Sequence, residues 1–190
     1  MPRDSAETRK RILNAANRLF YAQGIRAVSV DAVAEKAGVT KKTLYYHFKS
    51  KDDLVTEYLT SRDQPNLDTF RKWFDETDGP LSDKVFAIFE GVAKGARHPK
   101  WRGCGFLRTA GELAAMPGHP AVKAGAAHKK RFEQWLADMF AADGIAASDT
   151  LARRVSLLME GAFASALIHR DPAYVIDAGE AARDLVSHRP

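Results

Sequence analysis

The feature that most constrains this fold is a pair of short amphipathic segments separated by only three residues. Residues 29–37 place apolar side chains at helical spacing, and Gly38 follows as a helix-ending residue. Thr40 then supplies an N-cap for a third segment. A glycine-containing link of this length between two short helices is typical of a helix-turn-helix.

The rest of the chain repeats apolar residues at the helical period and contains no strand-like alternation of useful length. We expect helices over residues 5–23, 30–38, 41–48, 51–78, 82–97, 103–115, 121–142, 149–170 and 172–186. Pro65 lies inside the fourth segment and is expected to kink or break it. The predicted fold class is therefore all-α with about nine helices, and the domain boundary falls near Ser50.

The composition excludes several other classes of protein. Hydrophobic residues make up 45% of the 190 residues, which suits a globular core, and the single cysteine cannot form an internal disulfide. The first residues lack the apolar segment of a secretion signal, and no run reaches the roughly 18 apolar residues of a membrane span. We therefore expect a cytoplasmic protein with no membrane partner.

Positive charge is concentrated near the amino terminus. Residues 1–51 contain eleven Lys or Arg and four Asp or Glu, a net charge of +7, whereas the remaining residues have a net charge of −2. A polyanion is the natural partner of such a segment, although a solvated basic face without a partner has the same composition.

The segment 41–48 indicates which side chains would meet that polyanion. Leu44 and Phe48 stand four residues apart, so both lie on one helix face, which we expect to pack against the first two helices. The opposite and flanking positions of this helix carry Lys42, Thr43, Tyr45 and Tyr46.

This exposed face suits the major groove of double-stranded DNA. Lysine donates to guanine there, a threonine methyl contacts the thymine methyl, and tyrosine hydroxyls reach phosphates or base edges. His47 either contacts a phosphate or remains a surface histidine, and Lys51 lies beside the free N–H groups of the next helix start. The alternative is a packing module whose exposed polar residues bind nothing.

The stretch from Ser29 to Lys51, SVDAVAEKAGVTKKTLYYHFKSK, resembles the amino-terminal signature of the TetR family of transcriptional regulators. The resemblance covers about residues 8–55 and rests on the Gly-Val-Thr turn, the Leu-Tyr-Tyr-His-Phe run and the Lys-x-Lys tail. It implies a three-helix, helix-turn-helix DNA-binding domain over residues 1–50 and a larger helical ligand-binding and dimerisation domain over residues 51–190. The candidate DNA-contacting residues are Ser29, Thr40, Lys41, Lys42, Thr43, Tyr45, Tyr46, His47 and Lys51.

One short recognition helix is a small interface, so we expect a homodimer that spans two half-sites about 34–36 Å apart. Similar family members pair through two carboxy-terminal helices per subunit, and small residues in the last two segments allow such close packing. They could equally pack within one subunit. The candidate interface residues are Leu158, Ala162, Ser165, Ala166, Tyr174, Ala178 and Leu185.

The middle of the chain is rich in aromatic and methionine residues. Most of these fill a core, yet large rings between helices also line apolar cavities. The resemblance implies an inducer pocket enclosed by the fourth to seventh helices. The candidate ligand-binding residues are Phe70, Trp73, Phe74, Phe89, Trp101, Cys104, Phe106, Phe132, Trp135 and Met139.

Cys104 supports two interpretations. It lies near a helix start and several cations, which favour the thiolate form, so it is either a sensor of oxidants or electrophiles or an inert packed thiol. The neighbouring histidines show no metal-ligand spacing, and we expect neither a metal nor another cofactor. A helical enzyme using Cys104 or Glu112 would lack a nucleophile-base arrangement.

The expected function is that of a ligand-responsive transcriptional regulator, a repressor, that binds a palindromic operator as a homodimer. A small hydrophobic or aromatic effector would release the DNA by moving the fourth helix and with it residues 1–50, which we call the head. The alternatives are a constitutive regulator without an inducer and a redox or electrophile sensor acting through Cys104.

Overall fold

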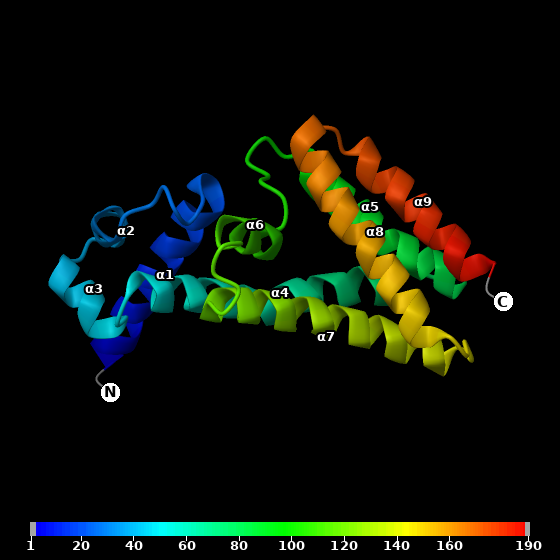
Figure 1. Cartoon of the computed structure of the whole chain (residues 1–190), viewed down its shortest axis with the longest axis horizontal. Coiled ribbons are helices and arrows are strands. Elements are labelled where there is room, and N and C mark those ends of the chain that lie inside the picture. The colour runs from blue at the N-terminus through cyan, green and yellow to red at the C-terminus, as the bar shows by residue number, and fades with distance from the viewer. Residues whose placement is uncertain (1–2, 189–190) are drawn as a thin grey trace. The chain divides into compact units, whose positions relative to one another are not determined.

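The computed structural model describes residues 3–188, and within this range the chain folds into nine α-helices (Figure 1). The all-α class and the helix count are those predicted, and each boundary lies within one helical turn of its predicted position. In chain order the helices are α1 (Arg3–Gln23), α2 (Val30–Ala37), α3 (Lys41–His47), α4 (Lys51–Asp75), α5 (Leu81–Ala96), α6 (Gly105–Glu112), α7 (Pro120–Ala142), α8 (Ser148–His169) and α9 (Ala173–Ser187).

The chain forms two compact units. The first contains residues 1–63 and 105–126, and the second contains residues 64–104 and 127–190. The helices α4 and α7 each contribute residues to both units. These two units are defined by compactness. The division at residue 50 was predicted from function, and it stays a prediction.

Local hydrogen bonds set the boundaries of α2 and α3. The hydroxyl of Ser29 accepts from the N–H of Ala32 at 3.1 Å, and that of Thr40 accepts from the N–H of Thr43 at 3.1 Å. Gly38 ends α2 in the left-handed conformation, with φ of 65°. These caps fix the sharp turn between the two helices that the sequence predicted.

The first unit has an apolar core under the helix-turn-helix. Ile12, Ala16 and Phe20 follow one another at intervals of four residues and form the buried stripe of α1. Leu44 of α3 and Phe48 at its end are 0% and 1% exposed. The burial of these two side chains fixes which face of α3 remains on the surface.

A carboxylate from α6 holds the turn between α1 and α2. The two oxygens of Glu112 accept from the backbone N–H groups of Ile25 and Arg26 at 3.1 and 2.8 Å. Gly24 precedes them with φ of 89°, and a Cβ there would lie 2.9 Å from Glu112 Oε1. Arg108 of the same helix donates to the carbonyl oxygen of Tyr21 at 2.7 Å. We call these contacts the α6 latch.

The helix α4 continues through Pro65, so the expected break is absent. A proline inside a helix removes one backbone hydrogen bond, but Pro65 is exposed and water can replace it. The buried residues Leu67 and Phe74 lie beyond the proline and favour continuation of the helix.

In the second unit α9 packs against both α5 and α8 (Figure 1). Gly179 permits the close approach of α9 to α5, because a Cβ at that position would lie 2.7 Å from Cβ of Phe89. The side chains of Val155, Met159 and Val175 are buried there. This packing leaves at the surface one face of α8 and α9, which carries Leu157 and Tyr174.

The α6 latch yields a prediction for local stability. Glu112→Ala removes the acceptor of two N–H groups, which should lower the free energy of unfolding by about 1–3 kcal/mol. Amide hydrogen exchange at Ile25 and Arg26 should accelerate. Glu35→Ala on the exposed face of α2 is the control, and unchanged exchange in the Glu112 variant would contradict the latch.

Candidate functional site

The exposed face of α3 is polar and aromatic. Tyr46 is 79% exposed and Tyr45 is 44% exposed, while Lys41 and Lys42 are also exposed. Thr43 is half-buried beside them. The structure therefore brings the predicted recognition residues together on one surface, opposite Leu44.

Neighbouring contacts orient several of these side chains. The hydroxyl oxygens of Thr40 and Thr43 lie 2.9 Å apart, and the ring of Tyr46 meets that of His47 edge-on at 5.1 Å. Lys41 donates to the carboxylate of Asp31 at 3.0 Å, and this hydrogen bond and charge raise the pKa of Lys41. Lys42 forms no ion pair with any described residue, so its ammonium group is available to an external anion.

The beginnings of two helices flank this surface. Ser29 caps α2, and Lys51 is the first residue of α4, after the capping residue Ser50. The first turn of α4 also carries Asp52 and Asp53, and Asp53 accepts from the N–H of Lys49 at 3.0 Å. Helix starts and basic side chains suit phosphate groups, but these two carboxylates reduce the local positive charge.

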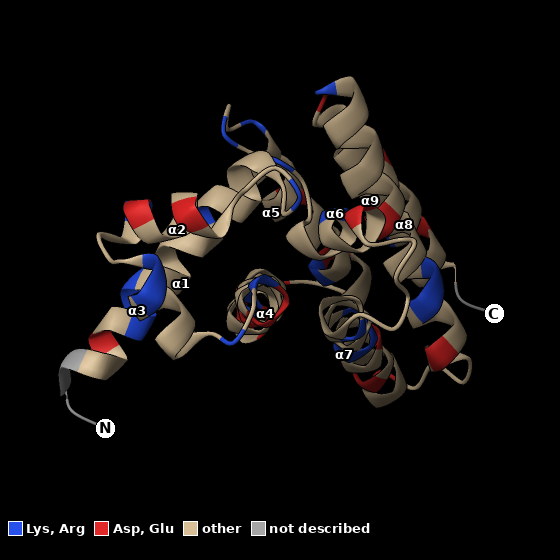
Figure 2. Ribbon diagram, turned by 60° about the vertical axis from the view of Figure 1, so that its left-hand side comes forward, with Lys and Arg blue, Asp and Glu red and all other residues tan. Residues whose placement is uncertain are grey.

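Part of the basic charge in the first unit has an internal role. Arg9 forms an ion pair with Glu57 at 2.8 Å and lies over the ring of Phe48 at 4.8 Å. Arg11 donates to the carbonyl oxygen of Ala37 at 2.7 Å. The net charge of residues 1–51 therefore overstates what is free to meet a polyanion. Figure 2 shows the remaining positive charge along α3.

The predicted ligand-binding aromatics of the second unit contact one another. The ring of Phe70 lies 5.2 Å from that of Phe132, and the ring of Phe74 lies 5.2 Å from that of Trp135. Phe132 and Trp135 are 6.0 Å apart. We call these four residues the aromatic cluster.

Of the other predicted pocket residues, Trp73 contacts the cluster, with its ring 5.9 Å from that of Phe70, and also borders a surface cavity. Trp101 borders a different surface cavity, and Phe106 belongs to the first unit. Phe89 is buried and faces Gly179 of α9. Met139 is half-buried. Their assignment to one effector pocket stays a prediction.

Cys104 has a charged neighbour that the sequence did not reveal. The ammonium group of Lys129 lies 3.3 Å from its sulfur atom, and the same group forms an ion pair with Glu160 at 2.5 Å. Burial opposes the charge of Lys129, but Cys104 and Glu160 outweigh it and raise the pKa of Lys129. Twenty-five residues separate Cys104 from Lys129, so no local motif indicates this contact.

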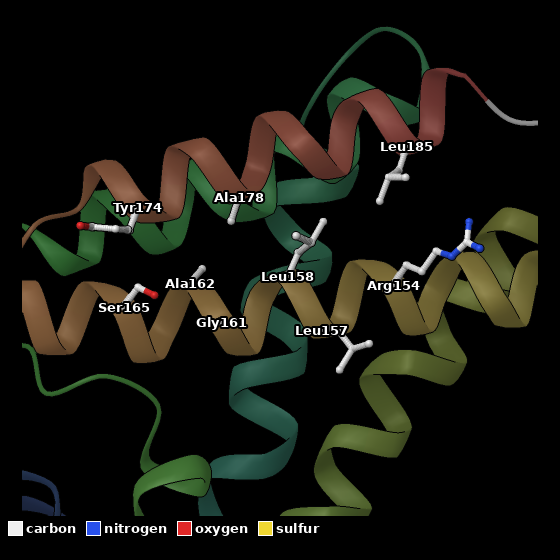
Figure 3. Close-up of a pocket in the computed structure, with 9 residues that line it drawn as sticks. All are labelled: Arg154, Leu157, Leu158, Gly161, Ala162, Ser165, Tyr174, Ala178 and Leu185. Carbon is white, nitrogen blue, oxygen red and sulfur yellow. The ribbon is translucent and has the colours of Figure 1, made fainter.

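The outer face of α8 and α9 contains an apolar groove of about 440 Å³ (Figure 3). It includes six of the seven predicted dimer residues, while Ala166 is buried within the unit. Leu157 borders the groove and is 65% exposed. A Cβ at Gly161 would meet nothing within 4 Å. The groove is lined by Arg154, Leu157, Leu158, Gly161, Ala162, Ser165, Tyr174, Ala178 and Leu185.

Two further features concern residues 3–188 as a whole. Among them no group of three or more His, Cys, Asp or Glu residues could hold a metal ion. No helix in that range combines the length and apolar character needed to cross a bilayer.

Curated proteins similar to this chain are transcriptional regulators. The chain is 42% identical over 62 residues to the HTH-type regulator SrpR of Pseudomonas putida, covering 33% of this chain and 29% of SrpR. It is 46% identical over 54 residues to AcrR of Shigella flexneri, covering 28% of this chain and 25% of AcrR. The chain thus spans less than a third of the length of either relative.

Solved structures extend the similarity to nearly the whole chain. SCO4454, a TetR-family transcriptional regulator from Streptomyces coelicolor, is 30% identical with a TM-score of 0.84, covering 96% of this chain and 97% of that one. The reduced form of E. coli NemR shares the fold with a TM-score of 0.83 and 16% identity, covering 94% and 96% of the two chains. The family model for bacterial regulatory proteins of the tetR family matches residues 12–58. The chain is therefore a DNA-binding transcriptional regulator of the TetR family.

Proposed function

We propose that this protein is a ligand-responsive repressor that binds a palindromic operator as a homodimer and works in the cytoplasm. In this proposal residues 1–50 bind DNA, and residues 51–190 dimerise and bind the effector. The observation that carries it is the surface of α3, where burial of Leu44 and Phe48 leaves the tyrosines and Lys42 exposed.

The DNA contacts follow from the chemistry of that surface. Lys42 and Tyr46 project from the face opposite Leu44, which suits contacts with base edges in the major groove. Ser29, Thr40 and Lys51 lie at helix starts, which suit phosphates. The remaining proposed contacts come from Lys41, Thr43, Tyr45 and His47.

The groove on α8 and α9 supports the proposed homodimer. Large exposed apolar side chains at one surface mark interaction sites, and Gly161 and Ala162 would allow the helices of two subunits to approach closely. A two-fold pair also presents two copies of α3 to two half-sites. The occupant proposed for the groove is the same face of a second subunit.

The aromatic cluster and the other predicted pocket residues are the proposed effector region. A hydrophobic or aromatic compound that binds one arrangement of these side chains better than another would shift the population of helix positions. Both α4 and α7 contribute residues to the two units. A shift of either helix in the second unit would therefore be passed along its own backbone to the first. The ring contacts within the cluster equally fit a constitutive regulator with a filled core.

The recognition surface is tested by Tyr46→Ala. Because this side chain is 79% exposed, the free energy of unfolding should change by less than about 0.5 kcal/mol. Operator affinity should fall at least about tenfold through loss of groove contacts. Mobility shift with DNA fragments selected by the wild-type protein measures the effect. Met116→Ala, at an exposed residue outside the head helices, is the control, and wild-type affinity of the Tyr46 variant would refute the recognition surface.

The dimer is tested by Leu157→Asp, which places a charge on the apolar groove. The variant should elute as a monomer and bind the operator at least about tenfold more weakly, with unchanged helical circular dichroism. Light scattering coupled to size exclusion gives the mass. Met116→Asp adds the same charge at an exposed apolar residue elsewhere, and a dimeric Leu157 variant would exclude this interface.

A second candidate function is supported by the contact between Cys104 and Lys129. The ammonium group of Lys129 lies 3.3 Å from the buried sulfur, and a cationic neighbour is typical of cysteines that react with electrophiles. Both residues belong to the second unit, so modification there would disturb the packing of the effector region. In this alternative the inducer is a reactive electrophile.

The sensor alternative is tested with N-ethylmaleimide, because Cys104 is the one cysteine of the chain. The folded wild-type protein should gain a single adduct by mass spectrometry and then lose operator affinity about tenfold or more. Cys104→Ser should bind the operator and ignore the reagent. An adduct that leaves operator affinity unchanged would reject the sensor.

A further inference from the structure

We propose that a cationic cavity between the α5–α6 loop and the end of α8 binds a small aromatic carboxylate. The cavity has a volume of about 210 Å³ and lies in the second unit. Its lining includes Arg97, Arg102, Arg170 and His98 and contains no Asp or Glu. We call it the arginine cavity.

Two of these arginines lack an anionic partner. Neither Arg97 nor Arg170 forms an ion pair with a described residue, whereas Lys129 of the same unit pairs with Glu160. The acid next to Arg170 in sequence, Asp171, accepts from the N–H of Ala173 at 2.8 Å. The side chains of Arg97 and Arg170 are both exposed, so an anion could bind them without first breaking an ion pair.

The other two polar groups are held in place by the loop itself. Arg102 Nη1 donates to the carbonyl oxygens of Pro99 and Trp101, both at 2.8 Å. Nδ1 of His98 accepts from the N–H of Lys100 at 3.1 Å, so the neutral ring carries its hydrogen on Nε2. The three guanidinium groups and the His98 ring therefore all carry hydrogen-bond donors, and a carboxylate accepts hydrogen bonds from such groups.

The apolar wall of the cavity determines the chemistry of the ligand beyond its carboxylate. Trp101 stacks on Phe163 with ring centroids 6.4 Å apart and an interplanar angle of 19°, and Leu167 also lines the cavity. The volume is below the roughly 300 Å³ at which drug-sized sites begin. A single aromatic ring bearing a carboxylate satisfies both the cations and the indole wall, whereas inorganic phosphate satisfies only the cations.

The backbone of Arg170 provides an independent observation. Its φ is 55°, the one positive value for a non-glycine residue within the described chain. Helices commonly end with glycine in this conformation, so an arginine here carries backbone strain that glycine would avoid. Arg97 and Arg170 also lie at the carboxy-terminal ends of α5 and α8, where a positive charge offsets the helix dipole. That effect does not explain why the two residues share one cavity with Arg102 and His98.

Calorimetric titration of sodium benzoate into the 190-residue chain tests the proposal. One benzoate should bind per chain, with an affinity that falls as salt is added. Benzamide has the same shape without the charge, and inorganic phosphate has charge without the ring. Each should bind at least about tenfold more weakly, since a charge-assisted contact or the aromatic contact is lost. Absence of benzoate binding, or equal affinity for benzamide or phosphate, would overturn the assignment.

Two variants locate the site. Arg170→Gly removes the cation while relieving the backbone, so the fold is retained, and Arg97→Gln removes the second unpaired charge. Each should weaken benzoate binding about tenfold, while Lys123→Gln, at an exposed residue of α7, should leave it unchanged. Benzoate should also shift the indole N–H resonance of Trp101, identified with Trp101→Phe. Wild-type affinity in Arg170→Gly, or an unmoved Trp101 resonance, would place the binding elsewhere.

Discussion

The arrangement of the head depends on the burial of Leu44 and Phe48. The helix α3 has only seven residues, too few to be stable alone, so tertiary contacts must hold it. A buried leucine of this kind contributes about 2–5 kcal/mol when compared with alanine, which exceeds any single surface contact of α3. Since 3.6 residues make a turn, fixing Leu44 inward also fixes Tyr46 outward. The binding surface is thus a consequence of the core.

Local signals made most of the head predictable. Ser29, Gly38 and Thr40 act within four residues of where they stand, and the structure uses each as a cap. Interactions between residues distant in sequence were not predictable in the same way. Glu112 reaches N–H groups more than 80 residues earlier, and Lys129 reaches Cys104 across 25 residues. Pro65 does not break α4, because tertiary burial beyond it outweighs the local preference, while the kink expected there stays a prediction.

Charge in this protein has to be assessed residue by residue. Arg9 and Arg11 lie in the basic segment, yet one pairs with Glu57 and the other binds backbone carbonyl oxygens. Arg97 and Arg170 lie outside that segment, where the net charge is slightly negative, and they have no described ion-pair partner. Net charge therefore identifies the head as a candidate for DNA binding but conceals the arginine cavity, which depends on three arginines converging from two loops.

The helix α6 stands between two regions of proposed function along the chain. The loop residues 97–102 of the arginine cavity precede it directly, and Glu112 at its end holds the α1–α2 turn. The two hydrogen bonds of that turn are worth about 1–3 kcal/mol, and a tenfold difference in ligand affinity between two conformations is worth about 1.4 kcal/mol. A tenfold preference of a bound ligand for one conformation of residues 97–102 would therefore be comparable in free energy with the two hydrogen bonds of Glu112.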